Sequence, residues 1–117
     1  MEENTVLVKI IKILDSKKAV DINVIRTREL TIIADFFVIC TGTSSTHVRA
    51  LADELEDGLL KENINARSIE GKATGWILLD YSDIVVHIFT PDMREYYGLE
   101  RIWQDGDSVN IDELINE

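Results

Sequence analysis

Cysteine, histidine and basic residues are all scarce in this 117-residue sequence. Its single cysteine, Cys40, excludes an internal disulfide and a zinc site built from several thiolates. Lys and Arg number 12 against 22 Asp and Glu, which gives a formal net charge of -10. Tight binding to nucleic acid without regard to base sequence depends on basic side chains that displace counterions. We therefore expect little direct nucleic-acid binding, and a basic partner would instead be attracted.

Long hydrophobic runs are absent as well. No run reaches the length of about 20 apolar residues that a membrane-spanning helix needs. The start of the chain, Met1-Glu2-Glu3, lacks the basic region of a signal peptide. We expect a cytoplasmic protein with no membrane segment, and the length suits one domain with a single core.

The most hydrophobic part of the chain lies between residues 75 and 103. Two apolar runs, 76–81 and 84–89, flank the dipeptide Ser82-Asp83 and are too short for helices, so they predict a β-hairpin. Thr90 and Pro91 then suit the N-cap and the first position of a helix. This predicted helix carries large apolar and aromatic side chains as far as Trp103.

The period of two in a β-strand divides the hairpin residues between two faces. One face is ordinary core: Ile77, Leu79, Tyr81, Ile84, Val86 and Ile88. The other, termed the hairpin face below, consists of Trp76, Leu78, Asp80, Val85, His87 and Phe89. Large apolar groups beside a carboxylate and an imidazole suit a face that is partly covered, or covered by a partner. From these residues alone, a covering helix with Asp80 and His87 near its rim is the favoured interpretation.

The remaining segments complete an α/β pattern. Residues 4–18 predict a helix, 22–25 a short strand and 34–41 a central strand in which Cys40 is a core thiol. A helix capped by Ser44 or Ser45 should follow to about residue 63, and 66–70 form a short strand near an edge. We predict a single α/β domain over residues 1–103, with a mixed sheet of about five strands flanked by helices.

Residues 104–117 form an acidic C-terminal tail. They contain five acidic residues and no basic one, so they hold half of the net charge. They contain little apolar material, and we expect the tail to be loosely held. Its removal should leave the fold intact.

A catalytic constellation is not apparent. The two histidines, His47 and His87, have no partner at metal-ligand spacing. A strand followed by the turn 42–45 and a helix resembles the opening of the nucleotidyltransferase fold, whose enzymes hold magnesium with paired carboxylates. Here the strand after the helix carries only Glu70. The turn has one glycine and no lysine, so a P-loop is absent and a capped turn is favoured. We predict a nucleotidyltransferase-like topology without the catalytic carboxylates, no metal or cofactor, and no enzyme activity.

Several segments resemble the Iojap (RsfS) family of ribosomal silencing factors. They are Asp21-Ile22, residues 35–48 (DFFVICTGTSSTHV), Glu70-Gly71, and residues 76–81 (WILLDY), 83–87 (DIVVH) and 97–103 (YGLERIW). Their order and spacing cover most of residues 5–103. Three features differ from the family pattern: Ser82 replaces a usual glycine, Arg26 or its neighbour replaces a common acidic residue, and the tail is an extension.

The resemblance implies regulation of translation rather than catalysis. Members of the family bind the large ribosomal subunit through its fourteenth protein. They thereby block subunit joining and repress translation under nutrient limitation. The resemblance also favours a partner-binding role for Trp76, Asp80 and His87. We add Glu70 and Tyr81 to the predicted partner-binding residues because they lie at the neighbouring strand end and turn. A residual nucleotide-binding enzyme that uses the turn 42–45 is the alternative, and the sequence leaves open whether the protein forms a homodimer.

Overall fold

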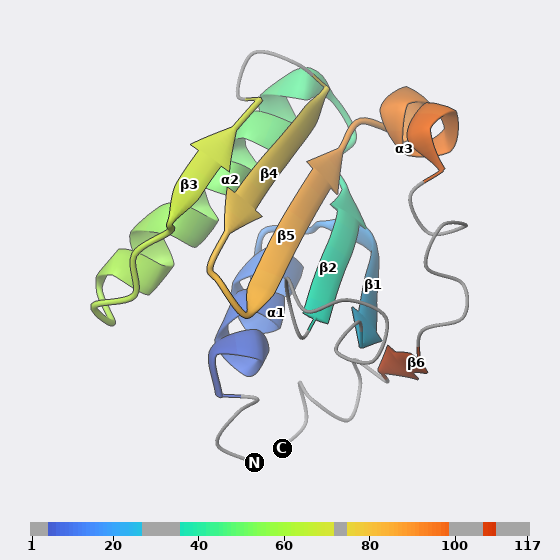
Figure 1. Cartoon of the computed structure of the whole chain (residues 1–117). Helices are drawn as coiled ribbons and strands as arrows, with labels where there is room; N and C mark the ends of the chain where they lie inside the picture. The colour runs from blue at the N-terminus through green and yellow to red at the C-terminus, as the bar shows by residue number, and fades with distance from the viewer. Residues whose placement is uncertain (1–4, 27–35, 72–74, 99–106, 110–117) are drawn as a thin grey trace.

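A mixed six-stranded sheet forms the centre of the molecule (Figure 1). The structure is a computed structural model that describes residues 5–26, 36–71, 75–98 and 107–109. The strand order is β3-β4-β5-β2-β1-β6. In chain order the strands are β1 (Val20–Arg26), β2 (Phe36–Thr41), β3 (Ser68–Glu70), β4 (Trp76–Asp80), β5 (Ile84–Phe89) and β6 (Asp107–Val109). Strands β2 and β5 are parallel and the other pairings are antiparallel, which confirms the predicted mixed sheet.

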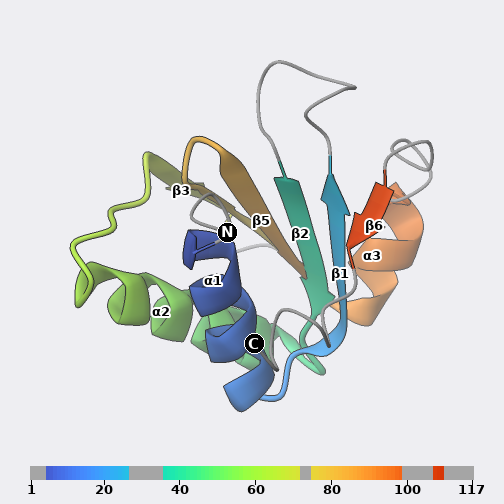
Figure 2. The same ribbon diagram turned by 90° about the horizontal axis from the view of Figure 1, so that it is seen from below.

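Within the described ranges, three helices pack around this sheet. Figure 2 shows α1 (Thr5–Ser16) and α2 (Ser45–Leu60) together on one side and α3 (Pro91–Tyr97) on the other. Ser44 caps α2 as predicted, because its hydroxyl oxygen accepts the backbone N–H of His47 at 3.1 Å. None of the helices in the described ranges is long and apolar enough to cross a membrane.

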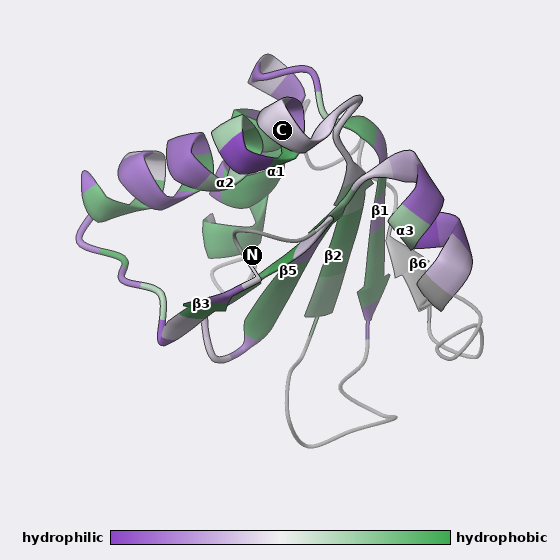
Figure 3. Cartoon of the chain, turned by 90° about the horizontal axis from the view of Figure 1, so that it is seen from above, coloured by the Kyte–Doolittle hydropathy of each residue, from purple (hydrophilic) through white to green (hydrophobic). Residues whose placement is uncertain are grey.

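The main core lies between the sheet and the α1–α2 pair. The buried stripe of α1 is the predicted one, Leu7, Ile10, Ile11 and Leu14. Against it pack the apolar stripe of α2 and the inward residues of the strands. Strands β2 and β5 appear largely green, that is hydrophobic, in Figure 3. Gly58 permits close approach of the two helices, since a Cβ there would lie 2.6 Å from Cδ1 of Ile13. The burial of each such Leu or Ile side chain contributes roughly 1.5–3 kcal/mol to the stability of the folded state.

The predicted hairpin is present with the expected register. Ile77 pairs with Ile88 and Leu78 with His87, so the two faces separate as the alternation indicates. At the turn, the N–H of Tyr81 donates to the carbonyl of Ile84 at 2.9 Å. Ser82 has φ of 71°, a left-handed conformation that favours glycine.

The last predicted helix is shorter in the structure than the sequence indicated. Helix α3 ends at Tyr97, because Gly98 adopts a left-handed C-cap with φ of 54°. The prediction of a helix through Trp103 was therefore wrong at Gly98, and residues 99–103 lie outside the described ranges. Thr90 occupies the N-cap position, but its hydroxyl makes no capping hydrogen bond.

A short strand not predicted from the sequence lies within the acidic tail. Residues Asp107–Val109 form β6, which pairs antiparallel with β1 at the edge of the sheet. The rest of the tail lies outside the described residues. Three tail residues thus belong to the sheet, and the boundary at residue 104 remains a prediction.

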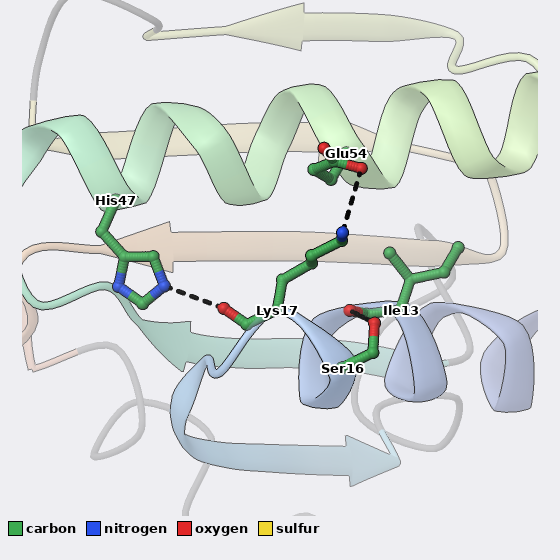
Figure 4. Close-up of polar contacts among 5 residues, drawn as sticks. All are labelled: Ile13, Ser16, Lys17, His47 and Glu54. Carbon is green, nitrogen blue, oxygen red and sulfur yellow. Dashed lines mark hydrogen bonds and ion pairs between the residues drawn. The ribbon is translucent and has the colours of Figure 1, made fainter.

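Cys40 and His47 both have structural roles. Cys40 is fully buried in β2, as predicted, and burial raises the pKa of its thiol to about 12. His47 joins two helices: its Nδ1 accepts the N–H of Thr43 at 2.8 Å, and its Nε2 lies 3.0 Å from the carbonyl oxygen of Lys17 (Figure 4). Nearby, Nζ of Lys17 lies 3.8 Å from a carboxylate oxygen of Glu54. His47 therefore fixes the end of α1 against the start of α2.

Candidate functional site

The hairpin face lies on the side of the sheet opposite α1 and α2. Its neighbours in the sheet are Ile39, which pairs with His87, and Phe37, which pairs with Val85. Helix α3 packs at one end of this face, where Met93 contacts the cluster formed by Ile25, Ile39, Phe89 and Trp76. The sequence favoured a helix that covers this face. In the described structure, α3 covers the end of the face that carries Trp76 and Phe89.

An aromatic cluster, termed the aromatic platform below, occupies the α3 end of the hairpin face. The indole of Trp76 stacks on the ring of Phe89 with centroids 5.1 Å apart. Its N–H donates to Nδ1 of His87 at 3.1 Å. The ring of Phe37 meets the His87 ring edge-on, with centroids 5.0 Å apart. Because Trp76 and Phe37 are only half-buried, these rings provide a rigid apolar surface that a partner could cover.

His87 lies beneath this surface. Its side chain is 4% exposed, and burial lowers the pKa of the imidazole to about 4. The ring is therefore neutral at neutral pH. Its Nε2 is buried and has no hydrogen-bond partner among the described residues. His87 supports Trp76 from below rather than lying on the surface itself.

Asp80 has a structural role at the end of β4. Its Oδ1 accepts the N–H of Ser82 at 2.8 Å and so stabilises the strained turn. Its Oδ2 lies 3.6 Å from Nε of Arg67, whose side chain is 72% exposed. An exposed ion pair of this kind contributes little to stability. Arg67 can therefore be exchanged for a basic group of a partner at small cost.

The two remaining predicted residues lie on different sides of the sheet. Glu70 pairs with Leu78 in the edge strand β3 and is exposed, so its register position belongs to the hairpin face. Tyr81 instead packs against the main core, and burial, with a smaller contribution from Glu56, raises its pKa to about 12. The structure thus places Glu70, Trp76, Asp80 and His87 on one face of the sheet, with Trp76 and His87 in direct contact and Asp80 four residues along β4 from Trp76, and it places Tyr81 on the other face.

Phe37 was missed by the sequence analysis. The strand 34–41 is almost entirely apolar, so its residues were all assigned to a core buried on both faces. The sequence carries no polar–apolar alternation at this place, and the half-burial of Phe37 beside the fully buried Val38 is visible only in the structure.

The turn 42–45 is poorly arranged for a phosphate. The N–H of Gly42 donates to Phe89, that of Thr43 to His47, and that of His47 to Ser44. These donors are therefore already occupied. Among the described residues, no group of three or more His, Cys, Asp or Glu side chains is placed to hold a metal ion.

A cleft of about 410 Å³ lies nearby, between the start of β1, the end of β2 and α3. Arg94 crosses it and donates to the carbonyl of Asp21 at 2.7 Å and to the hydroxyl of Thr41 at 2.8 Å. Asp21 and Glu95 also line the cleft, and their carboxylates disfavour an anionic ligand. These contacts fix α3 against the sheet and give no support to the nucleotide-binding alternative.

Comparison with known proteins decides the family. A family model described as "Ribosomal silencing factor during starvation" (RsfS) matches residues 1–117. The chain belongs to this family. Ribosomal silencing factor RsfS of Halalkalibacterium halodurans is 35% identical over 117 residues, which cover 99% of this chain and 100% of that protein. The Bacillus subtilis factor of the same name is 36% identical over 104 residues, 88% of each chain.

The fold of the RsfS family agrees with the structure described above. A crystal structure of a protein from Chromobacterium violaceum superposes with a TM-score of 0.85 at 31% identity and covers 89% of this chain and 88% of that chain. The relatives are named as silencing factors rather than enzymes. The resemblance noted in the sequence is therefore confirmed at the level of the family.

Proposed function

We propose that this protein represses translation in the cytoplasm by binding the large ribosomal subunit. The hairpin face would contact the fourteenth protein of that subunit and so block joining of the small subunit under nutrient limitation. The observation that carries the proposal is the half-buried Trp76 on the sheet face away from α1 and α2, a face that also carries Asp80 at the turn end of β4 and Glu70 on the neighbouring edge strand. The relatives' name, ribosomal silencing factor, supports a ribosomal partner.

The composition of the platform matches what concentrates binding energy in protein interfaces. Truncation of a central aromatic anchor typically costs about 2 kcal/mol or more, and Trp is among the most frequent anchors. Trp76 is held by its stack on Phe89 and its hydrogen bond to His87. Little side-chain entropy is therefore left to lose on binding, which favours affinity.

Charge supplies the second part of the argument. The chain carries a formal net charge of -10, so a basic ribosomal protein would be steered towards it. Asp80 is 18% exposed and its cationic neighbour Arg67 is largely in solvent. A Lys or Arg of the partner can therefore pair with Asp80 at the turn end of the hairpin face.

Co-sedimentation with purified large subunits tests this proposal. Trp76→Ala and Asp80→Lys should each abolish binding. Because Asp80 also accepts the N–H of Ser82, Asp80→Asn is the sharper variant: it keeps an acceptor oxygen and removes only the charge. We expect it to weaken binding about tenfold, the value of one lost charged contact.

Matched controls come from the outer surface of α2. Leu60→Ala removes an apolar side chain that is 44% exposed, and Asp57→Asn removes an exposed charge. Both should bind like the unchanged protein. Circular dichroism establishes that each variant is folded. Normal binding by folded Trp76→Ala and Asp80→Lys would exclude the hairpin face as the interface.

A further inference from the structure

The hydrogen bond from Trp76 determines which nitrogen of His87 carries the proton. An indole N–H only donates, so Nδ1 of His87 must act as the acceptor. A neutral imidazole has one donor and one acceptor nitrogen. The proton of His87 therefore resides on Nε2, and this nitrogen is a donor.

This Nε2–H donor is buried without an acceptor. The side chain is 4% exposed, and no described residue accepts a hydrogen bond from Nε2. The rings that border it belong to Phe37, Trp76 and Phe89, with centroids 5.0, 5.9 and 6.3 Å away. An aromatic ring offers at most a weak contact to an N–H group. Buried donors are almost always paired in native proteins, because an unpaired one costs free energy.

We propose that His87 is a specificity-determining residue of the hairpin face, and that its Nε2–H donates to a backbone carbonyl oxygen of the partner in the complex. This inference rests on the proposed function. A carbonyl is the expected acceptor, because the surface of a basic protein is rich in charged donors and poor in carboxylates. Binding would then satisfy a donor that the free protein leaves unpaired.

Access to Nε2 requires a side chain to move, since the atom is shielded from solvent. Trp76 is tied to the same ring by its hydrogen bond. Binding must therefore rearrange the groups that shield Nε2 without breaking the Trp76–His87 hydrogen bond. A surface that presents an N–H or an apolar group at this place would leave the donor unpaired, which is the basis of discrimination.

Two substitutions at His87 separate this role from simple packing. The carboxamide of His87→Gln can accept from Trp76 and still donate, whereas His87→Phe fills the space without either function. Affinity for the isolated fourteenth protein of the large subunit is measured by titration calorimetry. We expect His87→Gln to bind within about threefold of the unchanged protein and His87→Phe to bind about tenfold or more weakly, as for one lost buried hydrogen bond.

The stability of the free proteins gives a separate comparison. His87→Phe removes the unpaired Nε2–H donor but also the acceptor of the Trp76 N–H, so the two effects oppose each other and its urea midpoint should lie close to that of the unchanged protein. Weaker binding by an equally stable variant supports the proposal. If His87→Phe binds like the unchanged protein, the inference is wrong, while loss of binding by Trp76→Ala would still support the proposed function. If Trp76→Ala also binds normally, the proposed surface itself is wrong.

Nitrogen-15 NMR of the unchanged protein decides the matter if a variant fails to fold. Free and bound spectra report which ring nitrogen of His87 is protonated and how fast its proton exchanges with water. We expect Nε2 to be protonated in both, with its proton shifted and slower to exchange in the complex. An Nε2 that is unprotonated, or whose proton is unchanged by binding, would contradict the proposal.

Discussion

Trp76 and His87 lie 11 residues apart in the sequence and are joined by a hydrogen bond of 3.1 Å across two antiparallel strands. Only an imidazole whose Nδ1 is unprotonated can accept this bond. Burial keeps the ring neutral by lowering its pKa from 6.5 to about 4. The geometry of the aromatic platform is therefore coupled to the protonation state of one buried side chain.

This coupling predicts that the free energy of unfolding falls as the pH is lowered from 6.5 to about 4. Above that pH interval, His87 is neutral in both the folded and the unfolded chain. Within it, only the unfolded chain takes up the proton, so the folded state loses up to about 3 kcal/mol. Urea unfolding as a function of pH measures the loss. His87→Gln cannot titrate at this position and should lose less. Equal losses in the two proteins would show that other groups cause the effect.

The turn of the hairpin predicts a stabilising substitution. Ser82 has φ of 71°, which is unfavourable for a residue with a side chain. Ser82→Gly should raise the free energy of unfolding by about 0.5 to 1 kcal/mol, after allowance for the greater freedom of glycine in the unfolded chain. Ser82→Ala keeps the strain and serves as the control. Destabilisation by Ser82→Gly would show that the serine side chain stabilises the turn more than its backbone strains it.

The thiol of Cys40 should react slowly with thiol reagents in the native protein. The side chain is fully buried and burial raises its pKa to about 12, so little thiolate is available. Reaction should become fast in concentrated urea. Cys40→Ala should cost about 1 kcal/mol of stability and retain binding to the large subunit. Rapid modification of the folded protein would indicate that β2 opens readily.

Two truncations separate the roles of the acidic tail. Deletion of residues 110–117 removes Asp112, Glu113 and Glu117 and keeps β6. It should slow association with a basic partner and reduce its salt dependence, with little change in stability. Deletion of residues 105–117 also removes β6 and leaves the outer edge of β1 unpaired. We expect an additional loss of about 1 kcal/mol. Identical urea curves for both truncations would mean that β6 adds nothing to the sheet.

The sequence alone determined the local patterns and the family. The spacing of Leu7, Ile10, Ile11 and Leu14 defined the buried side of α1, and alternation between residues 76 and 89 defined both faces of the hairpin. These patterns succeed because a helix and a strand have fixed periods. The end of α3 was also present in the sequence as Gly98, but the apolar residues that follow outweighed it in the prediction.

Only the tertiary structure decided what each face contacts. Alternation placed Tyr81 opposite Trp76 but could not show that α2 and its neighbours cover the Tyr81 side. It could not show that Phe37 joins the aromatic platform or that His87 is buried beneath it, because both depend on the pairing of β2 with β5 across a long stretch of chain. The pairing of β6 with β1 is likewise non-local. Such contacts arise from strand order, which no single segment encodes.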